Sequence, residues 1–161
     1  MKTLQSIQEY LNDQNVESVL ETASASDPMD KLVLSMGEDK SQINLPLILR
    51  LIEEDNLMYL HAIQPYPFEV KTSNLGEMAR LLLMVNKAMQ IPALGLSEVE
   101  PQVYFQYAYY SSRKVLLGDD IDTLIHFSII FYQFYYEIIK KLAEGHTTLD
   151  VIIAEAKEVS L

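Results

Sequence analysis

The stretch FSIIFYQFYYEII, residues 127–139, constrains the fold of this chain more than any other segment. From residue 123 to residue 136 no side chain is an acid, a lysine or an arginine, but His126 and Gln133 interrupt the apolar run. A helix that spans a bilayer needs about 20 consecutive apolar residues. The segment therefore predicts a helix that is buried on most sides in a soluble protein.

This helix is predicted over residues 121–144, and its polar positions fall on one narrow stripe. At about 100° per residue the stripe collects five positions, which are Asp122, His126, Gln133, Glu137 and Lys140. The remaining arc is apolar, with Phe131 and Phe134 predicted deep within it and Tyr132 and Tyr136 predicted near its edge. Two interpretations stay open. Either the rest of the protein encloses the arc, or the edge near Tyr132 and Tyr136 faces a partner, since tyrosine combines an apolar ring with a hydroxyl that tolerates water.

A second aromatic segment, QVYFQYAYY at residues 102–110, follows Pro101 and predicts a strand. Alternation along a strand puts Val103, Phe105, Tyr107 and Tyr109 on one face and Tyr104, Gln106, Ala108 and Tyr110 on the other. The second face is either a recognition surface built around Tyr104 and Tyr110 or a sheet face covered by the N-terminal helix.

The other segments predict helices and strands that are segregated along the chain. Helices are predicted at residues 3–13, 74–90 and 147–158, the second with Asn74 and Glu77 as a capping box and the third capped by Thr147 or Thr148. Residues 16–21 favour a strand, and 31–36, 45–52 and 57–63 read as strands, the last two forming a hairpin around Asp55-Asn56. Residues 64–70, with Pro65 and Pro67, should end the sheet or form its edge. This order predicts the α+β class and one domain over residues 1–161.

Composition excludes several classes of protein. There is no cysteine, which rules out thiol catalysis, cysteine zinc sites and iron–sulfur ligation. The net charge is −11 and the basic residues are scattered, so neither nucleic acid nor an anionic membrane surface is an expected partner. The first residues, MKTLQSIQEYLNDQ, do not resemble a secretory signal, and we expect a cytoplasmic protein.

The sequence contains no nucleotide-binding, zincin or serine-hydrolase motif. The best candidate for chemistry is the cluster of Asp119, Asp120 and Asp122 with His126 one turn later, which could be imagined to hold Mg²⁺ in a small hydrolase. Carboxylates that stabilise the N-terminus of a helix are the more ordinary explanation. No cofactor and no catalytic residue are predicted.

Three consecutive segments resemble the YbjN family in the version found in cyanobacterial proteins. They are LILRLIEEDNLMYLHAIQPYPFEV (47–70), NLGEMARLLLMVNKAMQIPALGLSEVEPQVYFQYAYY (74–110) and the long helix that ends in KLAEG (141–145). The likeness is best over residues 31–145. It implies a type III secretion chaperone-like fold, with an antiparallel sheet packed against helices, and a dimeric, non-enzymatic module that binds a protein or peptide. An arginine common in relatives is replaced by Gln106, so no contact of that arginine is carried over.

These considerations predict a chaperone-like or adaptor protein, not an enzyme, that binds a polypeptide client. It would use an apolar groove or an exposed strand edge, with an acidic rim that prefers basic clients. The candidate partner-binding residues are Tyr104, Tyr110, Tyr132 and Tyr136. The alternatives are the small metal-dependent hydrolase and a passive subunit of a larger assembly.

Overall fold

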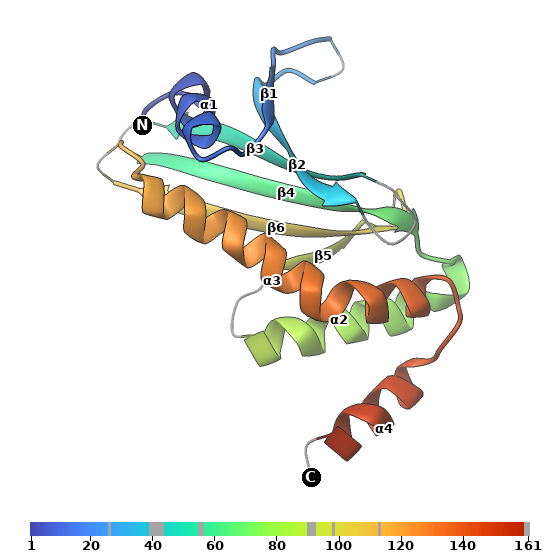
Figure 1. Ribbon diagram of the computed structural model, residues 1–161. Coiled ribbons are helices and arrows are strands. Elements are labelled where there is room, and N and C mark those ends of the chain that lie inside the picture. The colour runs from blue at the N-terminus through green and yellow to red at the C-terminus, as the bar shows by residue number, and fades with distance from the viewer. Residues whose placement is uncertain are drawn as a thin grey trace. The chain divides into compact units, whose positions relative to one another are not determined.

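The computed structural model describes residues 1–25, 27–38, 44–54, 57–89, 93–97, 99–112 and 114–159. The elements, in chain order, are α1 (Leu4–Asp13), β1 (Ser18–Glu21), β2 (Lys31–Glu38), β3 (Asn44–Glu54), β4 (Leu57–Glu69), a short 3₁₀ turn (Thr72–Asn74), α2 (Leu75–Met89), β5 (Leu94–Ser97), β6 (Gln102–Ser111), α3 (Gly118–Ala143) and α4 (Leu149–Val159) (Figure 1). The strands form one sheet in the order β1-β2-β3-β4-β6-β5. The predicted α+β class with an antiparallel sheet is confirmed.

The chain divides into two compact units. The first unit contains residues 1–65 and 106–129, and the second contains residues 66–105 and 130–161. The strands β4 and β6 and the helix α3 each begin in one unit and end in the other. The prediction of a single domain over residues 1–161 stays a prediction.

In the first unit the sheet has an inner face of buried leucines. The register places Leu34 opposite Leu47 and Leu49 opposite both Leu32 and Ala62, so these side chains share one face. All of them are completely buried. Each inner-face side chain of this size stabilises the fold by roughly 1.5–3 kcal/mol through removal from water.

Helix α1 and the first half of α3 lie on this inner face (Figure 1). In α1 the apolar positions are Leu4, Ile7 and Leu11, which recur at helical spacing and are all buried. Thr3 caps the helix, because its hydroxyl accepts a hydrogen bond from the Ser6 amide at 3.1 Å. The helix predicted over residues 3–13 is therefore confirmed.

Tyr10 joins α1 to the first turn of α3. Its hydroxyl donates a 2.7 Å hydrogen bond to Asp122 Oδ2, and this bond raises the pKa of Tyr10. Its ring lies so close to Gly118 that a Cβ atom there would be 2.7 Å from it. Gly118 is thus required by the close approach of an aromatic ring.

The strand assignments are mostly confirmed. Residues 18–21 form β1, and β3 and β4 form the predicted hairpin, paired from Ile48↔Ile63 to Glu54↔Leu57. The turn predicted at Asp55-Asn56 lies outside the described residues. For residues 64–70, the prediction that the sheet ends there is wrong, because β4 continues through both prolines to Glu69 and lies between β3 and β6 in the strand order. The alternative of an edge is met on one side, since the described pairing of β4 with β3 ends at Ile63.

Strand geometry explains how β4 accommodates its prolines. Pro65 and Pro67 are two residues apart, so their backbone nitrogens lie on the same side of the strand. Tyr66 has its backbone on the other side, where its carbonyl accepts from the Gln102 side chain of β6 at 2.9 Å. The described pairing of β4 with β3 ends at Ile63, so the missing N–H groups fall beyond it.

The second unit packs α2, α4 and the second half of α3 with β5 and the adjoining parts of β4 and β6. The predicted capping box of α2 is wrong, because both of its side chains bond to other elements. The Asn74 amide donates to the Leu142 carbonyl at 2.8 Å, and the Glu77 carboxylate accepts from the Leu149 amide at 2.7 Å. These two bonds tie the start of α2 to the end of α3 and to α4.

Among the residues that the structure describes, no helix combines the length and the apolar character that crossing a membrane requires.

Candidate binding surfaces of the first unit

The four tyrosines predicted to bind a partner occupy different environments. Tyr110 is 60% exposed in the first unit, with its ring 5.3 Å from that of Tyr59. Tyr104 and Tyr132 are half-buried in the second unit. The expected exposure of Tyr136 is wrong, since this side chain is 2% exposed. The prediction of partner binding by these tyrosines stays a prediction.

The physical reason for the burial of Tyr136 is an aromatic cluster with the end of β4. Its ring centroid lies 5.3 Å from that of Tyr66, 5.5 Å from that of Phe68 and 4.5 Å from that of Tyr132. Lys140 places its ammonium 5.8 Å from the centroid of the same ring. On the opposite flank of α3, Phe134 was expected deep in the core and is 72% exposed.

Tyr104 has a structural role that the sequence did not reveal. It lies opposite Gly95 in the β5–β6 register, and a Cβ atom at Gly95 would be 2.4 Å from its ring. The ring therefore covers the backbone of β5, an arrangement in which an aromatic residue compensates for a glycine in a strand.

The acidic cluster at the start of α3 is engaged in local hydrogen bonds. Asp120 accepts from the Leu117 amide at 2.8 Å, and Asp122 accepts from the Tyr10 hydroxyl. His126 is exposed. In the described part of the chain, no group of three or more histidines or acids is arranged to hold a metal ion.

The two edges of the sheet are partly covered by side chains. At β1 the Gln8 amide donates to the Ser18 carbonyl at 3.1 Å. At β5 the Asn86 side chain bonds to both the amide and the carbonyl of Leu94. Side chains that occupy outward backbone groups discourage the addition of another strand. Of the two modes expected for client binding, the strand edge is therefore the less favoured.

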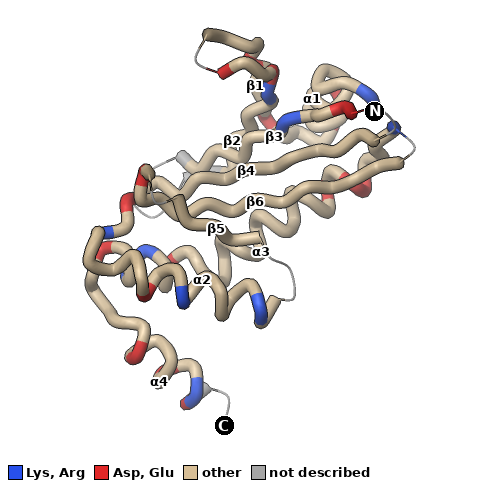
Figure 2. The backbone as a smooth tube through the Cα atoms, turned by 180° about the vertical axis from the view of Figure 1, so that it is seen from behind, with Lys and Arg blue, Asp and Glu red and all other residues tan. Residues whose placement is uncertain are grey.

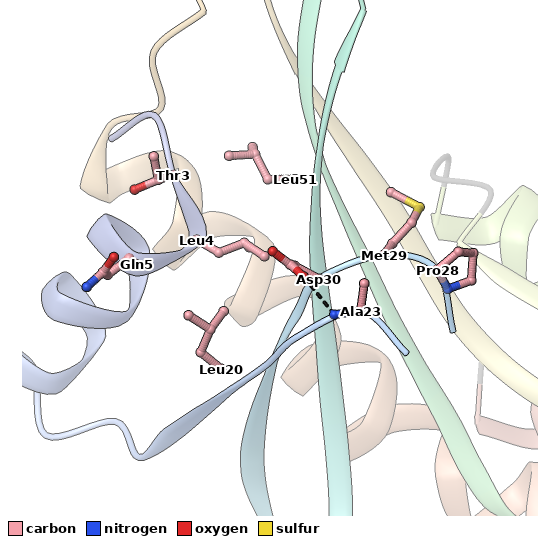
Figure 3. A pocket seen from close by; sticks show the side chains of 9 residues that line it. All are labelled: Thr3, Leu4, Gln5, Leu20, Ala23, Pro28, Met29, Asp30 and Leu51. Carbon is pink, nitrogen blue, oxygen red and sulfur yellow. Dashed lines mark hydrogen bonds between the residues drawn. The ribbon is translucent and has the colours of Figure 1, made fainter. Parts of the chain in front are cut away.

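An open groove lies where the inner leucine face emerges beside α1 (Figure 3). It has a volume of about 530 Å³, within the range of sites that hold small ligands or side chains. Leu4, Leu20 and Leu51 point into the same space from α1, β1 and β3 (Figure 3). The groove is further lined by Thr3, Gln5, Ala23, Pro28, Met29 and Asp30.

The connection between β1 and β2 holds one wall of the groove in place. Asp30 accepts a 2.7 Å hydrogen bond from the Ala23 amide, drawn as a dashed line in Figure 3. Met29 and Leu20 are half-buried, so the wall is apolar yet accessible. Among the described residues that line the groove there is no lysine or arginine, and Asp30 gives its rim a negative charge.

The reverse side of the sheet forms an outer face that is only half-buried. Along each strand, the side chains of this face alternate with the inner leucines. Figure 2 shows the protein from behind, with β6 in front of the first turns of α3. The outer face is made of Val19, Glu21, Lys31, Val33, Ile48, Arg50, Ile52, Tyr59, His61, Ile63 and Tyr110. None of these side chains is buried to the extent of the inner leucines.

Sequence reasoning missed both surfaces for identifiable reasons. The groove is assembled from α1, β1, β3 and a connecting segment, and no periodicity links such positions. The outer face was hidden because β3, NLPLILRLIEE, is apolar on both faces. Only Arg50, within an otherwise apolar run, signalled that one side meets water.

No protein-family model matches this sequence, and no curated protein matches it either.

Proposed function

We propose that this protein is a non-enzymatic binding module, chaperone-like or an adaptor, that holds an apolar segment of a client polypeptide in the groove beside α1. The observation that carries the proposal is the concave space of about 530 Å³ with a leucine-lined floor. A core-type surface left open to water is unusual in a monomer and is typical of an interaction site.

The client would carry a leucine-sized or larger apolar side chain with lysine or arginine beside it. The apolar side chain would displace water from Leu4, Leu20 and Leu51. A neighbouring cation would be attracted by Asp30 at the rim and by the net charge of −11 on the chain. The proposal extends to a cytoplasmic location, and the resemblance to the YbjN family agrees with it.

Selection from a random peptide library followed by fluorescence anisotropy tests the proposal. Selected peptides should combine an apolar residue with basic residues and should bind more weakly at high salt. Leu51→Asn and Met29→Ser should each weaken binding by about tenfold or more, since each removes part of the apolar floor.

Met84→Ser is the matched control, because Met84 is 46% exposed on α2 in the second unit and does not line the groove. Its affinity for the same peptides should equal that of the wild type. Selected peptides that bind both groove variants as tightly as the wild type would overturn the proposal, as would a selection that yields no sequence preference.

A further inference from the structure

Three residues that line the groove each have a charged residue of the outer face as their neighbour in the chain. The pairs are Leu20 with Glu21 on β1, Asp30 with Lys31 where β2 begins, and Leu51 with Arg50 on β3. Neighbouring residues of an extended chain point to opposite sides of the sheet. The groove and a set of charged side chains therefore share the same short stretches of backbone.

Asp27 joins these charged side chains into one cluster. Its Oδ2 accepts a hydrogen bond from Lys31 at 3.0 Å and one from Arg50 at 2.7 Å. Lys31 also bonds to Glu21 at 3.2 Å. The side chains of Asp27, Lys31 and Arg50 are at most 26% exposed, so water and salt screen the bonds among them only in part. We call Glu21, Asp27, Lys31 and Arg50 the ion-pair clamp.

The charges of the clamp balance at neutral pH. Its two carboxylates face two cations, and the hydrogen bond from Lys31, followed by that from Arg50, lowers the pKa of Asp27. His61 lies opposite Arg50 on β4. Burial, and then the charge of Arg50, lower the pKa of His61, which is therefore neutral at neutral pH. No further charge on β4 disturbs the clamp at this position.

Asp27 also folds the connection between β1 and β2, which forms one wall of the groove. Its backbone N–H donates to Ser24 Oγ at 3.2 Å, and its carbonyl accepts from the Ser24 amide at 2.7 Å. The three residues that follow Asp27 all line the groove. The bond from Arg50 ties this wall to β3, the strand that carries Leu51 on the groove side. Asp27 thus connects the wall of the groove to its floor.

We infer that Asp27 is a positioning residue of the groove, which fixes the distance between wall and floor from the outer face and so selects the side chains that enter. The inference rests on the proposed function, because it assigns Asp27 a role in client binding. Asp27 is not one of the residues that line the groove, so its effect on a client passes through the wall. A site of fixed shape discriminates between side chains that differ by one methylene, whereas a loose site adapts to both.

Amide hydrogen exchange measured by NMR on the full chain tests the state of the wall without a client. The Ala23 amide donates to Asp30 and the Ser24 amide donates to the Asp27 carbonyl, each at 2.7 Å. In Asp27→Asn both amides should exchange at least about tenfold faster, because the wall opens more often. Amides in the middle of β3 should keep their wild-type rates, which separates local opening from global unfolding.

Fluorescence anisotropy with the selected peptides tests the consequence for binding. Asp27→Asn should weaken binding about tenfold, whereas Asp27→Glu should stay within about threefold of the wild type because it keeps a carboxylate near both cations. Glu53→Gln is the matched control. It removes one carboxylate from a 2.9 Å ion pair with Lys114 in the same unit, and Glu53 does not line the groove. Its affinity should equal that of the wild type.

Discrimination between two peptides separates positioning from a general loss of stability. A selected peptide should bind the wild type about tenfold more tightly than its form shortened by one methylene at the apolar position. In Asp27→Asn this ratio should fall to less than half in logarithmic terms. Arg50→Met should act in the same way. The double variant should bind no more than about twofold more weakly than the weaker single variant, because both changes break the same bond.

Wild-type exchange rates at Ala23 and Ser24 in Asp27→Asn would overturn the inference, whether or not any peptide binds. Faster exchange with unchanged affinity and discrimination would also overturn it, as would an Asp27→Glu or a Glu53→Gln variant that binds as weakly as Asp27→Asn. A wild type that selects no peptide would overturn the proposed function, and the exchange rates would still decide whether Asp27 holds the wall. The proposed function and the role of Asp27 can thus fail separately.

Discussion

The side-chain amide of Asn86 pairs with the backbone of Leu94 as a neighbouring strand would. Its Nδ2 donates to the Leu94 carbonyl at 2.9 Å, and its Oδ1 accepts from the amides of Leu94 at 2.9 Å and Ala93 at 3.1 Å. One residue of α2 thereby satisfies the outward backbone groups of the edge strand β5 and fixes the helix against it.

Asn86→Ala should therefore cost about 1–3 kcal/mol of unfolding free energy, because it leaves part-buried backbone groups without partners. Asn86→Asp keeps an acceptor for the two amides but cannot donate to the Leu94 carbonyl, so it should also destabilise the protein. Urea unfolding measures both. Asn12→Ala, at an exposed position of α1, is the control and should stay within about 0.5 kcal/mol of the wild type. Equal stabilities for Asn86→Ala and Asn12→Ala would contradict the proposed role.

Gly95→Ala should destabilise the protein, since the added Cβ would lie 2.4 Å from the Tyr104 ring and the ring must move. We expect a loss of roughly 1–3 kcal/mol, typical of overpacking. In a Tyr104→Ala background the same substitution should cost much less stability. Thermal melts of the wild type, the two single variants and the double variant complete the double-mutant cycle.

Gly76→Ala should raise the stability of the protein, in contrast to Gly95→Ala. Nothing lies within 4 Å of a Cβ at Gly76 in α2, so alanine should stabilise the helix by about 0.5–1 kcal/mol. If Gly95→Ala were also stabilising, the close contact with Tyr104 would not limit this position.

Tyr66 carries a fully buried hydroxyl with no hydrogen-bond partner among the described residues. Tyr66→Phe removes this group while keeping the ring packed against Phe68 and Tyr136. The substitution should be neutral or should raise the unfolding free energy by about 1 kcal/mol. Tyr10→Phe should instead lower the unfolding free energy, because it removes the hydroxyl that donates to Asp122. A loss of stability in Tyr66→Phe would indicate that the buried hydroxyl has a partner.

The buried Tyr66 also predicts that the protein loses stability at high pH. Burial raises the pKa of Tyr66 above the ordinary value of 10.0, so the neutral form is favoured in the folded state. Its contribution to stability is complete below about pH 10 and is lost as the pH rises toward the folded pKa. Over that interval Tyr66 should lower the unfolding free energy by about 1.4 kcal/mol per pH unit. Urea midpoints above pH 10 should fall less steeply in Tyr66→Phe than in the wild type, and parallel slopes would contradict this assignment.

Local patterns predicted the elements well where a single periodicity dominated. The helix at residues 3–13 and the strand at 102–110 have one clear apolar face, and both form where expected. The prolines of β4 led to a wrong prediction of where the strand ends. A proline lacks an N–H on one side of its strand only, and the sequence does not say on which side another strand is paired.

Side-chain roles that depend on another element were not predictable. Asn74 and Glu77 fit a local capping box, yet Leu142 and Leu149 offer them backbone partners that are distant in sequence. In the same way, the groove needs Leu20 and Leu51 to meet Leu4, and only the assembled sheet brings them together.

The helical wheel of α3 located the polar stripe correctly but could not decide which flank faces the sheet. His126, Gln133 and Glu137 are exposed as expected. The exposed arc continues on the flank of Thr123, Phe134 and Lys141, whereas Tyr136 on the other flank packs on β4. The two flanks are similar in composition, so periodicity alone leaves their assignment open.

This correction gives opposite predictions for neighbouring aromatic residues of α3. Phe131 is fully buried against Phe105, with ring centroids 5.4 Å apart, and Phe131→Ala should cost about 3–5 kcal/mol through lost burial and a cavity. Tyr136→Ala should be similarly severe, because Tyr136 is 2% exposed. Phe134→Ala should change the unfolding free energy by no more than about 0.5 kcal/mol, since 72% of its surface already meets water. Thermal and urea unfolding of the three variants decides the matter, and a Phe134→Ala variant as unstable as Phe131→Ala would show that the exposed flank of α3 is covered in the folded protein.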